Sequence, residues 1–75
     1  MSQLTGVHIL ERLMQERKLT QEQLGLLLGC TKGRVSQIIR EEKPSNEALL
    51  RTSEVLHVNL MELVDGEGRW LRFDV

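Results

Sequence analysis

The spacing of hydrophobic residues along the chain predicts a series of short α-helices. Between residues 5 and 17, apolar side chains recur every three or four positions with charged residues between them, which is typical of an amphipathic helix. The same spacing predicts further helices at about 21–28, 46–56 and 60–64, and one that begins after Thr31 and frays near Arg40 to Glu42. Residues 69–75 instead alternate, with Leu71, Phe73 and Val75 on one side, as in a strand. The pattern therefore predicts five helices followed by a strand-like tail.

Capping residues set the boundaries of these predicted helices. Thr20 and Gln23 have the spacing of a capping box, in which each side chain bonds the backbone N–H of the other. Thr31 and Ser45 are predicted N-caps for the next two long helices. Gly29 ends the helix before Thr31, because glycine accepts the left-handed backbone found beyond a helix end.

The composition indicates one small domain with a local rather than a global positive charge. The chain has 75 residues, of which 40% are hydrophobic and 28% charged, with a net charge of -1. Trp70 and Phe73 are the only aromatic residues, so the core should be aliphatic, which favours packed helices. We expect a helical domain over 1–65 and a tail over 66–75. Any nucleic-acid binding must then depend on local charge.

Several classes of function are disfavoured by the residues present. Cys30 is the single cysteine, so we expect no disulfide and no cysteine-rich zinc site. His8 and His57 are isolated, and we expect them to face solvent or to lie at helix ends. We expect no metal, no cofactor and no enzyme activity. The absence of a signal peptide or long apolar run predicts a cytoplasmic protein without a membrane segment.

Residues 21–40 have the pattern of two helices that cross closely over a tight turn. Gly25 within the first helix allows a close approach, and Gly29 provides the turn. This segment resembles the helix-turn-helix of the XRE family, the lambda-repressor and Cro-like regulators, and the resemblance extends over roughly residues 7–64. The residues that carry it are Gln21-x-x-Leu24-Gly25-x-x-Leu28-Gly29-Cys30-Thr31-x-x-x-Val35-Ser36-Gln37-Ile38.

The resemblance implies a five-helix, lambda-repressor-like, all-α DNA-binding domain whose 32–40 helix lies in the major groove. Lys32 would donate to guanine, and Gln37 would pair with adenine. The predicted base-reading residues are Lys32, Gly33, Ser36 and Gln37. The predicted phosphate-binding residues are Gln21, Thr31, Arg34, Arg40, Lys43, Ser45 and Asn46. Three basic residues and no acidic one lie between Gly29 and Arg40, which favours an anionic partner there.

The tail suggests how two copies would meet. A strand at the end of a helical domain lacks a partner in its own chain, so we expect it to pair with its copy in a homodimer. The predicted dimerisation residues are Trp70, Leu71, Phe73 and Val75. The alternative is that Trp70 and Phe73 fold back onto the helices.

The leading hypothesis is a phage- or plasmid-type repressor that binds double-stranded DNA as a homodimer on a palindromic operator. An antitoxin-like or antirepressor-like module with a protein partner is the alternative, and a controller of a restriction-modification locus is a third. Three departures from the family pattern bear on these hypotheses. The loop Arg40–Lys43 lacks the usual glycine, Thr52 and Ser53 replace more apolar residues, and Leu26 and Leu27 replace polar ones.

Overall fold

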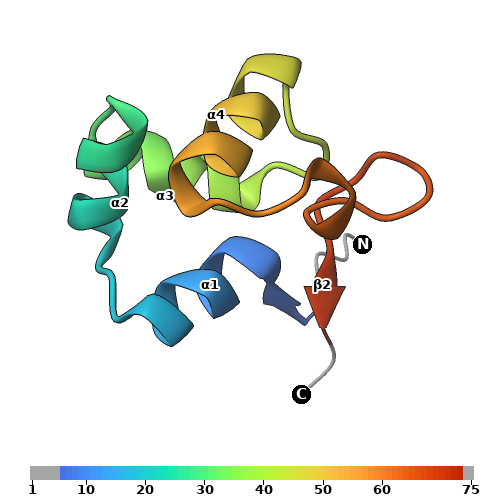
Figure 1. Cartoon of the computed structure of the whole chain (residues 1–75), viewed down its shortest axis with the longest axis horizontal. Helices are drawn as coiled ribbons and strands as arrows, with labels where there is room; N and C mark the ends of the chain where they lie inside the picture. The colour runs from blue at the N-terminus through green and yellow to red at the C-terminus, as the bar shows by residue number, and fades with distance from the viewer. Residues whose placement is uncertain (1–5, 74–75) are drawn as a thin grey trace.

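Four α-helices surround an aliphatic core, and a two-stranded sheet closes one end of the molecule (Figure 1). The computed structural model describes residues 6–73. The helices are α1 (Ile9–Arg17), α2 (Gln21–Leu28), α3 (Lys32–Arg40) and α4 (Asn46–Leu56), followed by the single 3-10 turn η1 (Leu60–Glu62). The strands are β1 (Val7–His8) and β2 (Arg72–Phe73).

The structure confirms the second, third and fourth predicted helices and corrects the first and fifth. The first helix begins at Ile9 and not near residue 5, because Gly6 has φ +85° and His8 is extended. The two residues before Ile9 are a strand. The predicted fifth helix is only the 3-10 turn η1, capped by Asn59. The fold is therefore mostly helical, with a small sheet that the sequence did not predict within one chain.

The N-caps follow the predicted chemistry, with one addition. Thr20 and Gln23 form the expected capping box, and Thr31 and Ser45 cap α3 and α4. At α1 the cap is His8, whose Nδ1 accepts from the N–H of Leu10 at 3.0 Å. His8 therefore lies at a helix end, as expected, but it is fully buried and does not face solvent.

The tail departs from its prediction, because β2 has a partner within its own chain. It pairs antiparallel with β1, with Val7 opposite Phe73 and His8 opposite Arg72. Trp70 lies in the core with 3% of its surface exposed, and its ring is 5.0 Å from that of His8. The fold-back alternative thus describes the structure, and the argument from an unpaired strand is wrong.

The hydrophobic core is aliphatic apart from Trp70, and all four helices contribute to it. Partly buried residues from the turn, from η1 and from the tail pack around it, among them Cys30 and Phe73. No helix within residues 6–73 is both long and apolar enough to cross a membrane. The buried hydrophobic residues are Ile9, Leu10, Leu13, Met14, Leu24, Leu28, Val35, Ile38, Leu56, Leu63 and Trp70.

Candidate nucleic-acid interface

Helices α2 and α3 are joined by a turn that requires glycine at two positions. Gly29 has φ +77°, a backbone region that L side chains rarely adopt. A Cβ at Gly25 would lie 2.8 Å from the carbonyl oxygen of Cys30. The N–H of Cys30 also donates to the Gly25 carbonyl at 2.8 Å. The close approach predicted at Gly25 is therefore made by the backbone of the turn, which fixes where α3 begins.

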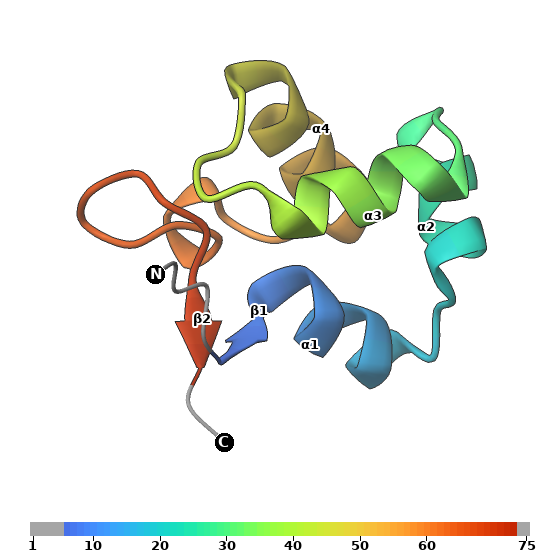
Figure 2. The ribbon, with the colours of Figure 1, turned by 180° about the vertical axis from the view of Figure 1, so that it is seen from behind.

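The predicted base-reading residues belong to α3, which lies at the front in Figure 2, and none of them is among its buried residues, Val35 and Ile38. Lys32, Gly33 and Gln37 are exposed, and Ser36 is half-buried. The Ser36 hydroxyl donates to Oε1 of Gln21 at 2.8 Å, so the first residue of α2 holds a side chain in the middle of α3. This bond ties the two helices together at the predicted DNA surface.

Gly33 is not required by the fold. A Cβ at this position would meet only the Thr31 hydroxyl, at 3.8 Å, which is an ordinary contact. Gly33 is exposed and lies within the first turn of α3. A glycine in an exposed helix costs about 1 kcal/mol relative to alanine. The backbone here is therefore accessible to a close neighbour, because no atom of residues 6–73 would crowd a side chain at this position.

Arg34 is held by its neighbours. Its Nη1 donates to Oε1 of Gln37 at 3.2 Å and lies 3.6 Å from the Glu41 carboxylate. The ion pair with Glu41 reduces the positive field that the sequence predicts over Gly29–Arg40. A phosphate at Arg34 would have to compete with this carboxylate.

The other predicted phosphate-binding residues fall into two groups. The hydroxyl oxygens of Thr31 and Ser45 accept from the N–H groups of Arg34 and Ala48, and their O–H groups are left to donate. Arg40, Lys43 and Asn46 have exposed side chains along the end of α3 and the start of α4. These residues lie at the start of α3, at its end and at the start of α4, a suitable arrangement for contact with a phosphate backbone.

A cavity of about 200 Å³ lies behind α3, between the α2–α3 turn and the beginning of α4. Cys30 lines it and is a free thiol. The full lining of the cavity is Leu28, Gly29, Cys30, Arg34, Ile38, Ser45, Glu47, Ala48 and Arg51.

No group of three or more histidine, cysteine or acidic side chains suited to a metal occurs within residues 6–73.

Sequence reasoning missed two groups near this surface. Arg72 of β2 donates to the carbonyl of Ile39 in the last turn of α3, and no local pattern points to that contact. His8 is buried against Trp70, and burial together with the nearby Arg72 charge lowers its pKa to about 4. The spacing of His8 and Glu11 matches a capping box, the one signal that could have placed this histidine at the end of α1.

Comparison with known proteins gives one match. A family model described as helix-turn-helix matches residues 10–63, which include all four α-helices apart from Ile9. Searches among curated proteins and among solved structures found no match. The matched range includes every predicted base-reading and phosphate-binding residue and ends before Trp70.

Proposed function

The chain belongs to the XRE-type helix-turn-helix family of DNA-binding regulators, and on that premise we propose that it is a repressor that binds a palindromic operator as a homodimer. The observation that carries this proposal is the bond between Gln21 and Ser36. It fixes the start of α2 against the outer face of α3, where Lys32, Gly33 and Gln37 are exposed.

Direct readout by α3 is the source of sequence specificity in this proposal. Lys32, which is exposed at the start of α3, would donate to guanine O6 or N7. The Gln37 amide has two N–H groups and a second lone pair on its oxygen besides the one that Arg34 uses. Gln37 can therefore still make the two bonds that recognise adenine. The missing side chain at Gly33 leaves room for a base edge to approach the backbone.

Phosphate contacts position α3 in the groove. The candidates lie at the start of α2, at the start of α3 and in the segment from the end of α3 to the start of α4. They are Gln21, Thr31, Arg34, Arg40, Lys43, Ser45 and Asn46. Each phosphate neutralised by a basic residue releases counterions, so the affinity should fall steeply as salt rises. The net charge of -1 makes this slope depend on a few residues near α3 and not on the whole surface.

The homodimer is proposed from the way this motif meets a two-fold operator, with half-sites one helical turn apart. Trp70 is removed from the predicted contacts because its side chain is in the core. Leu71 and Phe73 are half-buried and keep part of their surface, and Val75 lies outside the described residues. Light scattering over a range of concentrations, with and without operator, tests the dimer directly.

The test of DNA recognition is selection of a site from random duplexes, followed by affinity measurements at several salt concentrations. Gln37→Ala should relax one base position in each half-site and weaken specific binding about tenfold, because a base contact is worth about 1–3 kcal/mol. Gln15→Ala is the matched control, since Gln15 is exposed on α1 and lies outside α2 and α3. Equal effects of the two substitutions, or no binding at low salt, would refute the proposal.

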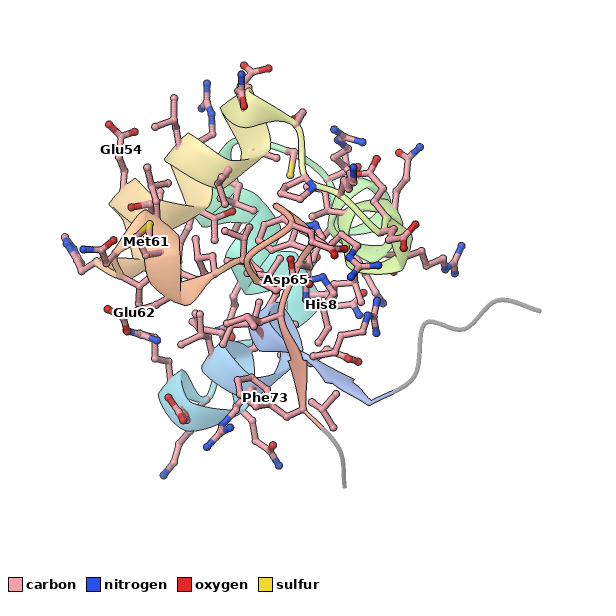
Figure 3. All side chains as sticks on the ribbon, turned by 90° about the vertical axis from the view of Figure 1, so that its right-hand side faces the viewer. His8, Glu54, Met61, Glu62, Asp65 and Phe73 are labelled. Atoms are coloured by element: carbon pink, nitrogen blue, oxygen red, sulfur yellow. The ribbon has the colours of Figure 1, made fainter. Side chains whose placement is uncertain are left out.

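A second function, binding of another protein, is favoured by exposed apolar side chains. Leu26 is 77% exposed and Met61 is 80% exposed. Met61 projects outward beside Glu54 and Glu62 (Figure 3). Isolated exposed leucines are common, so this function is the weaker candidate. It becomes the leading one if the chain binds no DNA and Leu26→Ser abolishes capture of a partner encoded by a neighbouring gene.

A further inference from the structure

Helix α3 ends differently from the other helices. Of the four α-helices in residues 6–73, α1, α2 and α4 end at Lys18, Gly29 and His57, each with a left-handed backbone. In that conformation the chain turns back and bonds the last carbonyls of the helix. Helix α3 ends at Glu41, which has φ −76° and ψ 142°. The chain leaves α3 in an extended conformation, consistent with the missing glycine in the loop Arg40–Lys43.

An arginine from the far end of the chain bonds the carbonyl in the last turn of α3. Nη2 of Arg72 donates to the carbonyl oxygen of Ile39 at 2.9 Å, across 33 residues of sequence. The last four carbonyls of a helix have no partner within it, and a cation there also interacts favourably with the helix dipole. Arg72 is held in place by β2, whose partner β1 follows Gly6, and Nη1 of Arg72 donates to the Gly6 carbonyl at 3.5 Å.

The residues before β2 hold the loop that follows α3. The N–H of Trp70 donates to the carbonyl of Glu42 at 3.0 Å. Nη1 of Arg69 lies 3.5 Å from the Glu42 carboxylate. Figure 2 shows this loop passing beside the C-terminal segment before it reaches α4. The loop carries Lys43 and follows Arg40, two of the predicted phosphate contacts.

We propose that residues 64–73, here named the C-terminal brace, position the end of α3 and the loop after it for contact with DNA phosphates. Arg72 is the main positioning residue, and the backbone of Trp70 is the second point of attachment. The brace takes the place of the left-handed turn that ends the other helices. It lies outside the matched range 10–63, so it is an addition to the helix-turn-helix unit. The proposal rests on the proposed function, because it assigns the brace a part in DNA binding.

The experiment compares Arg72→Ala with Arg12→Ala. The guanidinium carbon of Arg12 lies 4.4 Å from the ring centre of Phe73, which belongs to the same strand as Arg72. The ion pair of Arg12 is with Glu16 of its own helix, and within residues 6–73 no hydrogen bond or ion pair joins its side chain to α3. Amide hydrogen exchange reports on the last turn of α3, and the salt dependence of DNA affinity reports on phosphate contacts. For Arg72→Ala we expect exchange at Ile39–Glu41 to become at least tenfold faster. The salt slope should fall by about one to two units, since each phosphate contributes about 0.9. Arg12→Ala should change neither.

A second substitution separates the helix end from general stability. Glu41→Gly supplies a left-handed residue directly after α3, and it should restore slow exchange at Ile39–Glu41 in the Arg72→Ala background. Glu41→Ala removes the same ion pair with Arg34 but not the backbone restriction, so it should not restore slow exchange. Both substitutions release Arg34 for a phosphate, so the salt slope is compared between the two, and it should be steeper for Glu41→Gly. If Arg72→Ala does not fold, Arg72→Lys replaces it with the same expected direction, because it keeps the charge but not the forked guanidinium that bonds two separate carbonyls.

Three results would overturn the proposal. Exchange that rises equally at every core amide would assign Arg72 to general stability. An unchanged salt slope in a folded Arg72→Ala protein would remove its part in DNA binding. No binding of any duplex by the unaltered chain at low salt would refute the proposed function and, with it, the phosphate contacts. In that last case faster exchange confined to Ile39–Glu41 would still assign Arg72 to the end of α3.

Discussion

The buried His8 should make the stability of the protein fall steeply in mild acid. Its Nδ1 accepts from the N–H of Leu10, so the ring is neutral and carries its proton on Nε2. Protonation of Nδ1 would remove the helix cap and place a charge in the core beside Arg72. Burial and the charge of Arg72 accordingly lower the pKa of His8 from 6.5 to about 4.

The size and pH range of the effect follow from this shift. Between pH 6.5 and about 4 the unfolded chain binds one more proton at residue 8 than the folded chain, so stability decreases as the pH falls through that range. A difference of 2.5 pKa units corresponds to about 3 kcal/mol. A chain of 75 residues has a total stability of about 4–11 kcal/mol, so this one group accounts for a large part of it. Above pH 6.5 the contribution is complete and constant.

The assay is urea unfolding followed by circular dichroism at several pH values between 7.5 and 4. Because acidic side chains also titrate in this range, the informative quantity is the difference between variants. His8→Asn keeps an N-capping side chain but cannot titrate, so it should be less stable at neutral pH and lose about 3 kcal/mol less on acidification. His57→Asn, at an exposed left-handed position, should lose as much stability on acidification as the unaltered chain. A pH dependence in His8→Asn as steep as that of the unaltered chain would refute the reasoning.

Four substitutions test the packing and the surface of the helix-turn-helix. Gly25→Ala should destabilise the protein by about 1–3 kcal/mol, because its Cβ would lie 2.8 Å from the Cys30 carbonyl oxygen. An unchanged melting temperature in thermal unfolding would contradict this close contact. Gly33→Ala should instead stabilise the fold by about 0.5–1 kcal/mol while weakening operator binding, and tighter binding would exclude a close approach of DNA at this backbone. Leu24→Ala should lower the free energy of unfolding in urea by about 2–5 kcal/mol, because Leu24 is fully buried. Leu26→Ala should lower it by less than about 0.5 kcal/mol, because Leu26 is exposed. Similar losses would place Leu26 in the core.

The sequence predicted those parts of the fold that depend on local signals. Helices α2, α3 and α4 lie where Thr20, Thr31 and Ser45 placed their starts, because an N-cap bonds an N–H only three residues away. The candidate DNA surface was predicted as a set because the family motif fixes its spacing. The bond from Gln21 to Ser36 joins a predicted phosphate-binding residue to a predicted base-reading one.

The rest of the fold depends on contacts between distant residues, which no local pattern reveals. Val7 continues the helical spacing of Leu10 and Met14, so the periodicity gives no sign that β1 precedes the helix. Its strand character comes from pairing with Phe73 at the other end of the chain. The alternation of the tail was detected, but a strand of two residues needs only an equally short partner. The helical pattern of the preceding residues offered no such partner within the chain, so pairing with a second copy was predicted.

The pairing of Val7 with Phe73 also bears on the order in which the parts of this protein fold. Contacts between residues close in sequence allow the four helices to form early. The sheet joins residues near the two ends of the chain, so its formation carries the entropy cost of closing a long loop. During synthesis the end of α3 therefore stays unsupported until Arg72 has left the ribosome. A chain cut short before that residue would keep the turn between α2 and α3 but would lose the contact of Arg72 with the last turn of α3.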